Sequence, residues 1–143
     1  MPLARTALYA QGENLHVAVW PGSINNTVDL TRHIARENRM YVLSVSGLMR
    51  KEDINEDTPN HTVIRQNANE LLSNGGSCIA APDGSWVIEP IVGKEAVITA
   101  TINLNEVRKE RQNFDPSGHY SRPDVFELNV NTKRQKLVHF NSE

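Results

Sequence analysis

Two short apolar runs flank an amphipathic segment near the start of the chain, and few folds accommodate this order. The runs LHVAVW (15–20) and YVLSVSG (41–47) have the length and valine content of buried strands. Between them, VDLTRHIARENR places Leu30 and Ile34 on one face of an expected helix, with Thr27 as its expected cap. A strand, a helix and a strand with short joints predict a right-handed βαβ unit, whose strands are parallel neighbours in a covered sheet.

The rest of the chain predicts a mostly antiparallel meander within the same domain. A polar surface loop (48–61) and a short helix (66–74) precede three extended runs, at 77–81, 85–91 and 96–104. The first two runs are joined by Pro82-Asp83-Gly84, which is typical of a hairpin turn. A charged helix over 105–114, capped by Asn105, and an extended run over 125–131 complete the expected α/β architecture.

Composition excludes several classes of partner. The chain has 143 residues, enough for one domain, and a formal net charge of −2, so no basic excess indicates nucleic acid. No apolar run is long enough for a membrane span, and no signal peptide is evident. The single cysteine is typical of a reducing compartment, so we expect a cytoplasmic protein.

The residues by themselves show no motif for a catalytic nucleophile, a nucleotide or a metal ion. Cys78 lies within an apolar run, where a free cysteine is more often buried structure than nucleophile. The sequence contains no glycine-rich phosphate loop, and its five histidines lack metal-ligand spacing. We therefore expect no cofactor and no metal.

Three segments carry a resemblance to a known family. MPLARTALYAQG (1–12), GGSCIAAPDGSWVIEP (75–90) and FDPSGHYSRPDVF (114–126), in this order, resemble aliphatic-type nitrilases of the carbon–nitrogen hydrolase superfamily. The resemblance implies a carbon–nitrogen hydrolase domain over 1–135, followed by a tail at 136–143. It also implies part of an α-β-β-α sandwich, two copies of which form a dimer in this family.

The resemblance further implies that the catalytic groups lie outside this chain. Met1-Pro2-Leu3 is similar to the end of the nitrilase nucleophile motif, whose Cys-Trp-Glu part is absent here. The family's catalytic glutamate and lysine lie further upstream. We expect the carboxyl-terminal half of a nitrilase, truncated just after its nucleophile, with no catalytic residue and no activity alone. Nitrilases convert an organic nitrile to a carboxylic acid and ammonia through a cysteine thioimidate.

Candidate substrate-pocket residues follow the two expected parallel strands. Trp20, Pro21, Ser46 and Gly47 stand at the carboxyl ends of these strands, where ligands bind in open α/β sheets. The resemblance favours a pocket role for Trp20, although a large apolar residue closing the core is an equally valid interpretation. For Ser46 and Gly47 a purely structural role is the stronger alternative.

A second candidate group, His119, Tyr120 and Arg122, falls in a loop. The resemblance implies that these residues anchor a carboxyl-terminal segment at a subunit contact. Expected partners are a small organic nitrile, if the chain is part of a full-length enzyme, and either a second copy or an intact nitrilase subunit. Two classes stay open: a piece of a longer nitrilase, or a genuine short, non-catalytic paralogue or assembly partner. An unrelated α/β binding module would require all three matches to be coincidence.

Overall fold

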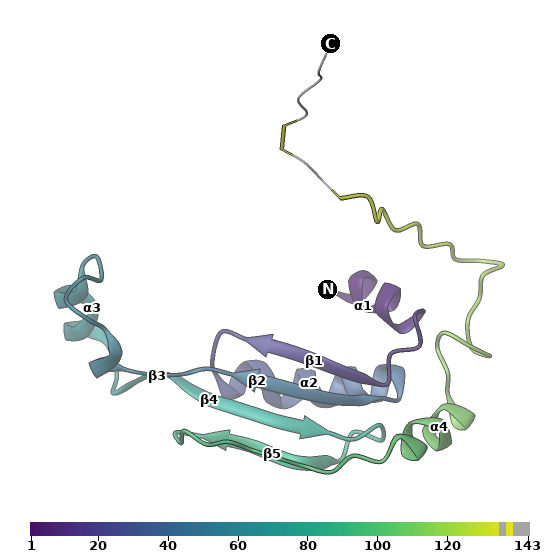
Figure 1. Ribbon diagram of the computed structural model, residues 1–143, viewed down its shortest axis with the longest axis horizontal. Helices are drawn as coiled ribbons and strands as arrows, with labels where there is room; N and C mark the ends of the chain where they lie inside the picture. The colour runs from purple at the N-terminus through teal and green to yellow at the C-terminus, as the bar shows by residue number, and fades with distance from the viewer. Residues whose placement is uncertain (135–136, 139–143) are drawn as a thin grey trace.

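A single sheet with helices around it organises the computed structural model, which describes residues 1–134 and 137–138 (Figure 1). The helices are α1 (Pro2–Tyr9), α2 (Ile24–Asn38), α3 (His61–Asn67) and α4 (Leu104–Asn113), with a 3-10 turn at Lys51–Asp53. The strands are β1 (Leu15–Trp20), β2 (Tyr41–Ser46), β3 (Leu48–Arg50), β4 (Leu71–Ala80) and β5 (Trp86–Val92). Their order is β1-β2-β4-β3, and β5 also pairs with β4. Most of the expected tail at 136–143 lies outside the described residues.

The predicted strand-helix-strand unit is confirmed. β1 and β2 are parallel neighbours in register from Leu15 opposite Tyr41 to Trp20 opposite Ser46, and α2 connects them. The expected cap at Thr27 is wrong, because the Ser23 hydroxyl caps α2 by accepting a hydrogen bond from the Asn25 amide. Thr27 instead lies fully buried within the helix.

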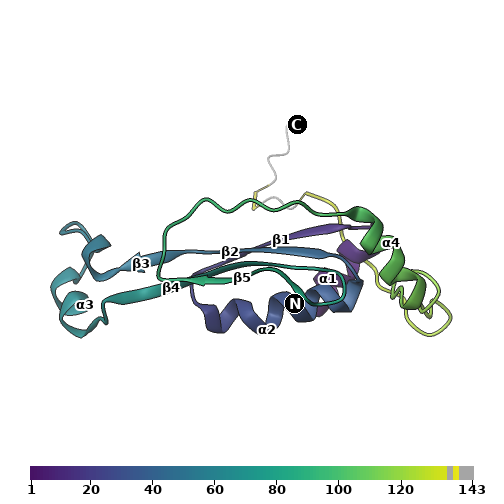
Figure 2. The same ribbon diagram turned by 90° about the horizontal axis from the view of Figure 1, so that it is seen from below.

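Helix α2 covers one face of the sheet, and the core lies between them. Its buried members come from α1, α2, the α2–β2 turn, β2 and β4: Tyr9, Ile34, Ala35, Met40, Val42 and Ala80. Figure 2 shows α2 on one side of the sheet and the segment between β5 and α4 crossing the other side. Within residues 1–134 and 137–138, each helix falls short of the length and apolarity that a membrane span requires.

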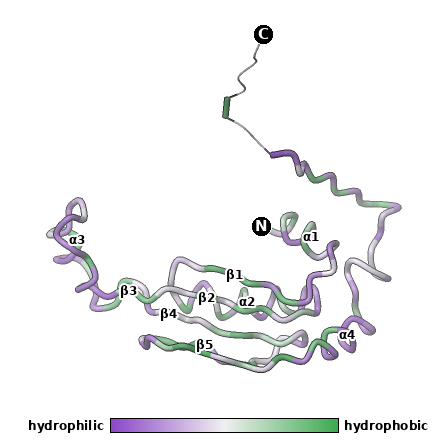
Figure 3. Tube along the Cα trace, in the orientation of Figure 1, coloured by the Kyte–Doolittle hydropathy of each residue, from purple (hydrophilic) through white to green (hydrophobic). Residues whose placement is uncertain are grey.

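The second face of the parallel pair is uncovered along β1 and at the end of β2. Along β1, exposed and half-buried residues alternate, and the exposed positions are the apolar Leu15, Val17 and Val19. Val45 of β2 is also 45% exposed. Figure 3 shows hydrophobic stretches along β1 and β5. The expected covering of the parallel strands is therefore present on the α2 face and incomplete on the other.

The middle of the chain differs from its prediction because long-range pairing overrides local pattern. The expected helix at 66–74 is wrong: α3 ends at Asn67, and Leu71 already belongs to β4. Part of the expected polar loop forms β3, whose Leu48 pairs with Asn74 of β4. β3 and β4 supply each other's backbone hydrogen bonds, which neither segment reveals by its own periodicity.

Two expected strands are absent. The run 96–104 crosses the sheet face as irregular chain until α4 begins, and 125–131 is irregular as well. Neither run pairs with another strand in the described part of the chain. Residues with high β-propensity form a strand only where a second segment accepts and donates the backbone hydrogen bonds. Helix α4 is confirmed, but Asn103 rather than Asn105 caps it, accepting a hydrogen bond from the Asn105 amide.

Candidate functional site

The carboxyl ends of β1 and β2 meet at one edge of the sheet, as their parallel register requires. The chain leaves β1 through Pro21-Gly22 and leaves β2 through Gly47. A Cβ atom on Gly22 would lie 2.5 Å from the Gly47 carbonyl oxygen, and Gly22 has φ +113°. Only glycine accommodates both the close approach and the backbone angle. The two strand ends are therefore in direct contact.

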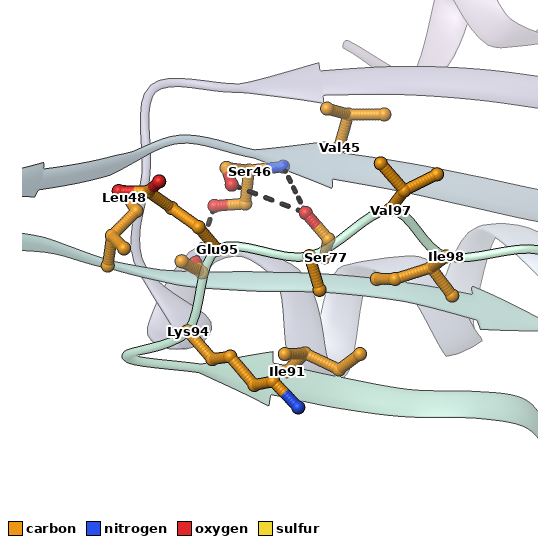
Figure 4. A pocket seen from close by; sticks show the side chains of 11 residues that line it. Val45, Ser46, Leu48, Ser77, Ile91, Lys94, Glu95, Val97 and Ile98 are labelled. Carbon is orange, nitrogen blue, oxygen red and sulfur yellow. Dashed lines mark hydrogen bonds between the residues drawn. The ribbon is translucent and has the colours of Figure 1, made fainter.

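Ser46 links this edge to β4 through a hydrogen-bond network. Its hydroxyl accepts a bond from the Ser23 amide at 3.1 Å and donates one to the Gly75 carbonyl at 2.6 Å. The Ser77 hydroxyl accepts from the Ser46 amide at 3.0 Å and donates to the Ser46 carbonyl at 3.2 Å, as Figure 4 shows. Ser46 is 7% exposed, so these bonds satisfy it within the protein.

The amino end of α2 points to the same edge, and side-chain oxygens accept hydrogen bonds from its backbone amides. The Asn74 Oδ1 atom accepts from the Ile24 amide at 2.9 Å, and the Ser23 hydroxyl accepts from the Asn25 amide at 3.2 Å. These bonds take the donors that would otherwise attract an anion. The structure thus uses this helix end to join α2 to β4.

A cavity of about 580 Å³ opens beside Ser46 on the face opposite α2. Apolar side chains form most of its wall, and Lys94 and Glu95 bring charge to it (Figure 4). Its other lining residues are Val45, Leu48, Gly75, Ser77, Ile91, Ala96, Val97 and Ile98. Glu95 is paired with Arg50, which leaves Lys94 as the cation facing the cavity. Such a lining fits a small, mainly apolar molecule with one polar end.

The four candidate pocket residues are separated by the structure. Ser46 lines the cavity, whereas Trp20, Pro21 and Gly47 share the sheet edge without lining it. The Trp20 indole Nε1 donates to the Ser44 hydroxyl at 3.0 Å, and that hydroxyl lies 2.6 Å from the Thr31 hydroxyl of α2. The indole is therefore directed toward the helix-covered face.

Cys78 has the environment of a structural thiol. It is 2% exposed, and its Sγ atom donates to the Thr31 hydroxyl at 3.6 Å. Burial raises the pKa of the Cys78 thiol, which disfavours the reactive thiolate. A nucleophile needs the opposite conditions, so this site holds no activated thiol. In residues 1–134 and 137–138, no cluster of three or more His, Cys, Asp or Glu residues is placed to hold a metal ion.

His119, Tyr120 and Arg122 follow α4 in the chain, and α4 lies at the opposite end of the sheet from β3 (Figures 1 and 2). The Tyr120 ring packs on Phe114 with centroids 4.8 Å apart, and His119 lies 4.9 Å from Tyr120. Arg122 forms two hydrogen bonds with Asp124, at 2.8 and 2.7 Å. These contacts are local, so the group orders its own exposed loop and does not reach the cavity.

Sequence reasoning missed the residues that complete the network around Ser46. Asn74, Gly75 and Ser77 come from β4, and the first of them fell within an expected helix. The available signal was the pair Gly75-Gly76 at the start of an extended run, because glycine inside a strand often marks a close backbone approach. Gly76 fulfils this, since an added Cβ would lie 2.7 Å from the Thr27 hydroxyl.

Known proteins match nearly the whole chain. The chain is 34% identical over 138 residues to the aliphatic nitrilase of Sinorhizobium fredii (strain HH103). This match covers 96% of this chain and 44% of that relative. It is 36% identical over 147 residues to nitrilase 2 of Arabidopsis thaliana, covering 100% of this chain and 43% of the relative. The arylacetonitrilase of Trametes versicolor (strain FP-101664) is 34% identical over 133 residues, covering 91% of this chain and 41% of the relative.

The chain spans less than half the length of the curated relatives it matches. The family described as carbon-nitrogen hydrolase matches residues 1–112, which include α1, the parallel β1-α2-β2 unit and the Ser46 network. The chain therefore belongs to the carbon-nitrogen hydrolase family.

Proposed function

We propose that the chain is the carboxyl-terminal portion of a nitrilase-type domain, which hydrolyses an organic nitrile to a carboxylic acid and ammonia. The relatives named as nitrilases support the reaction class, and their match to nearly all of this chain supports the assignment. In the proposed reaction, a cysteine thiolate from the remaining portion of the domain attacks the nitrile carbon. The nitrile nitrogen takes up a proton, and a covalent thioimidate forms.

Water completes the reaction in two additions. The first water adds to the thioimidate carbon, ammonia leaves, and a thioester remains on the cysteine. The second water breaks the carbon–sulfur bond, which releases the acid and returns the thiol. A glutamate as general base and a lysine beside the developing charge on nitrogen, both outside this chain, complete the proposed machinery.

This chain would contribute a wall of the substrate pocket. We assign the organic group of the nitrile to the sheet edge of Trp20, Pro21, Ser46 and Gly47, with the cavity beside Ser46 as its nearest space. The apolar lining of that cavity supports a mainly apolar substituent. His119, Tyr120 and Arg122 would serve assembly instead, because their loop is exposed and distant from this edge.

The uncovered face of β1 and β2 is the observation that carries the proposal. Val17 is 57% exposed and Val19 is 80% exposed, whereas parallel strands are ordinarily covered on both faces. Among the residues that the structure describes, β1 is also an edge strand that pairs only with β2. A further layer would cover this surface, supplied by the rest of the domain, by a second copy or by an intact nitrilase subunit. By itself the chain should be inactive, and we place it in the cytoplasm.

A second candidate function is that of a non-catalytic truncated paralogue that binds an intact nitrilase. The buried, protonated Cys78 and the uncovered β1-β2 face favour it, because the chain then offers a binding surface without a nucleophile. Both candidates share the carbon-nitrogen hydrolase fold and differ only in whether nitrile turnover follows association.

Ammonia release distinguishes these functions. The chain, its Cys78→Ala variant, and a mixture of the chain with the complementary fragment of the Sinorhizobium aliphatic nitrilase are each incubated with a small nitrile. We expect no ammonia from the chain alone and release from the mixture. Association without ammonia would favour the non-catalytic candidate. Release from the chain alone, abolished by Cys78→Ala, would contradict both.

A further inference from the structure

Besides the burial of Tyr9 in the core, helix α1 is held to α2 by hydrogen bonds to one carboxylate. Within the described residues, every side-chain hydrogen bond from α1 to another element ends on Glu37, in the last turn of α2. On its other side, Leu3 and Thr6 border a cavity of about 690 Å³ shared with residues 116–128. That side of α1 is therefore loosely packed, and its orientation depends on the contacts with α2.

The contacts at Glu37 form a closed triangle. The Tyr9 hydroxyl donates to Glu37 Oε2 at 2.6 Å, and Arg5 Nε donates to the same oxygen at 3.0 Å. Arg5 Nε also lies 3.1 Å from the Tyr9 hydroxyl, so the two α1 side chains support each other. His33, one turn earlier in α2, lies 3.6 Å from Glu37 Oε1. The carboxylate thus receives donors one turn apart on α1, which fixes rotation as well as position.

The ionisation of Glu37 fits this anchoring role. Partial burial acts to raise the pKa of Glu37, but the hydrogen bonds from Arg5 and Tyr9 outweigh it and lower that pKa. The carboxylate therefore stays charged at neutral pH, where charge-assisted hydrogen bonds are stronger than neutral ones. Tyr9 is 5% exposed and packs in the core, so its end of α1 is the fixed end.

We infer that Glu37 is a positioning residue, which sets the orientation of α1 and through it the placement of groups at the far end of that helix. The inference rests on the proposed function and on the resemblance of Met1-Pro2-Leu3 to the end of the nitrilase nucleophile motif, which together imply that the far end of α1 adjoins the catalytic centre. A helix of eight residues is about 12 Å long, so a tilt of about 10° about Tyr9 moves the far end by about 2 Å. Displacements of about 1 Å at a reacting group can cost about 100-fold in rate.

Hydrogen–deuterium exchange on the intact chain tests the anchoring directly. Glu37→Gln keeps the shape of the side chain and removes its charge, and Glu110→Gln is the matched control. Glu110, in α4, is also a partly buried partner of an arginine, Arg39, at 3.5 Å. We expect amides of α1 to exchange about 10-fold faster or more in Glu37→Gln, with α2 and α4 unchanged. Unchanged α1 exchange, or equal acceleration throughout the chain, would overturn the inference.

Nitrile turnover in the mixture with the complementary nitrilase fragment tests the positioning. Glu37→Gln should lower kcat by about 10-fold to 100-fold with KM nearly unchanged, and Glu110→Gln should preserve both. Arg5→Gln, which leaves the Tyr9 bond in place, should give a smaller loss of kcat. If the wild-type mixture releases no ammonia, the proposed function fails and the exchange experiment alone decides the role of Glu37. If the mixture is active and Glu37→Gln keeps the wild-type kcat, the inference fails.

Discussion

Ser46 and Ser77 hold each other through two hydrogen bonds made by a single hydroxyl. The Ser77 Oγ atom accepts from the Ser46 amide and donates to the Ser46 carbonyl, at 3.0 and 3.2 Å. The regular pairing of β2 with β4 extends only from Val42 to Ser44. Beyond Ser44, the Ser77 side chain satisfies the backbone groups that the ladder no longer reaches, and it fixes the floor of the cavity.

Ser77→Ala should lower the free energy of unfolding by about 1–3 kcal/mol, because the half-enclosed Ser46 amide loses its acceptor. Urea denaturation followed by circular dichroism measures the change. Ser117→Ala removes an exposed hydroxyl from the loop after α4 and should change stability by less than about 0.5 kcal/mol. Equal stability of the two variants would show that the Ser77 bonds do not stabilise the sheet edge.

Gly76→Ala should be severely destabilising. Gly76 has φ +102°, and a Cβ there would lie 2.7 Å from the Thr27 hydroxyl and 2.8 Å from the Ile24 Cα atom. Backbone strain and overpacking each cost about 1–3 kcal/mol. Gly12→Ala is the matched control, since Gly12 has φ +78° with nothing within 4 Å of the added carbon, and it should cost only about 1–2 kcal/mol. Equal melting temperatures of the two variants in thermal denaturation would refute the close approach of Gly76 to Thr27 and Ile24.

Cys78 should be protected from thiol reagents in the folded chain. Its thiol is buried against Thr31 and its pKa is raised by that burial, so both access and thiolate formation are disfavoured. The chain has one cysteine, so labelling by a chromogenic disulfide reagent reports this site alone. We expect labelling at pH 8 to be at least about 100-fold slower than in denaturant. Equal rates would place Cys78 at the surface.

Val19→Glu should weaken association through the uncovered face of β1. Val19 is 80% exposed, so the substitution should leave the fold of the chain intact while adding a charge that an apolar interface cannot pair. Val63→Glu is the control, because Val63 is 58% exposed on α3, away from this face. Analytical ultracentrifugation of each variant, alone and with the complementary nitrilase fragment, should show reduced association for Val19→Glu only. Identical association of both variants would exclude the β1 face as the contact.

Tyr9 should make the protein lose stability at alkaline pH. Burial, together with the hydrogen bond to the Glu37 carboxylate, raises the pKa of Tyr9 in the folded state. An unfolded tyrosine ionises near about pH 10, so above that pH the unfolded chain releases a proton that the folded chain retains, and unfolding becomes easier. Tyr9→Phe should therefore show a smaller loss of stability between about pH 9 and pH 11 in urea titrations. If the free energy of unfolding falls with pH equally in Tyr9→Phe and in the wild type, Tyr9 does not cause the alkaline loss of stability.

The sequence predicted the sheet edge where the candidate site lies, but not the residues of β4 that complete it. The rule that ligands meet the carboxyl ends of parallel strands directed attention to Ser46, which does line a cavity. Its partners Gly75 and Ser77 were not anticipated, because they reach Ser46 through a pairing between distant segments. The direction of the Trp20 indole was equally hidden, since a strand-end position does not determine which face of the sheet a side chain occupies.

Local sequence determined the parts of this fold whose partners are close in the chain. The β1-α2-β2 unit follows from two valine-rich runs around an amphipathic helix, because short joints leave one arrangement that packs the helix against the parallel pair. Tertiary structure alone decided the rest. β4 is a strand from Leu71 because β3 pairs with it, and the run 96–104 is not a strand because no partner lies beside it among the described residues. A helix satisfies its own backbone, whereas a strand depends on another segment, and that segment is chosen by the packing of the whole chain.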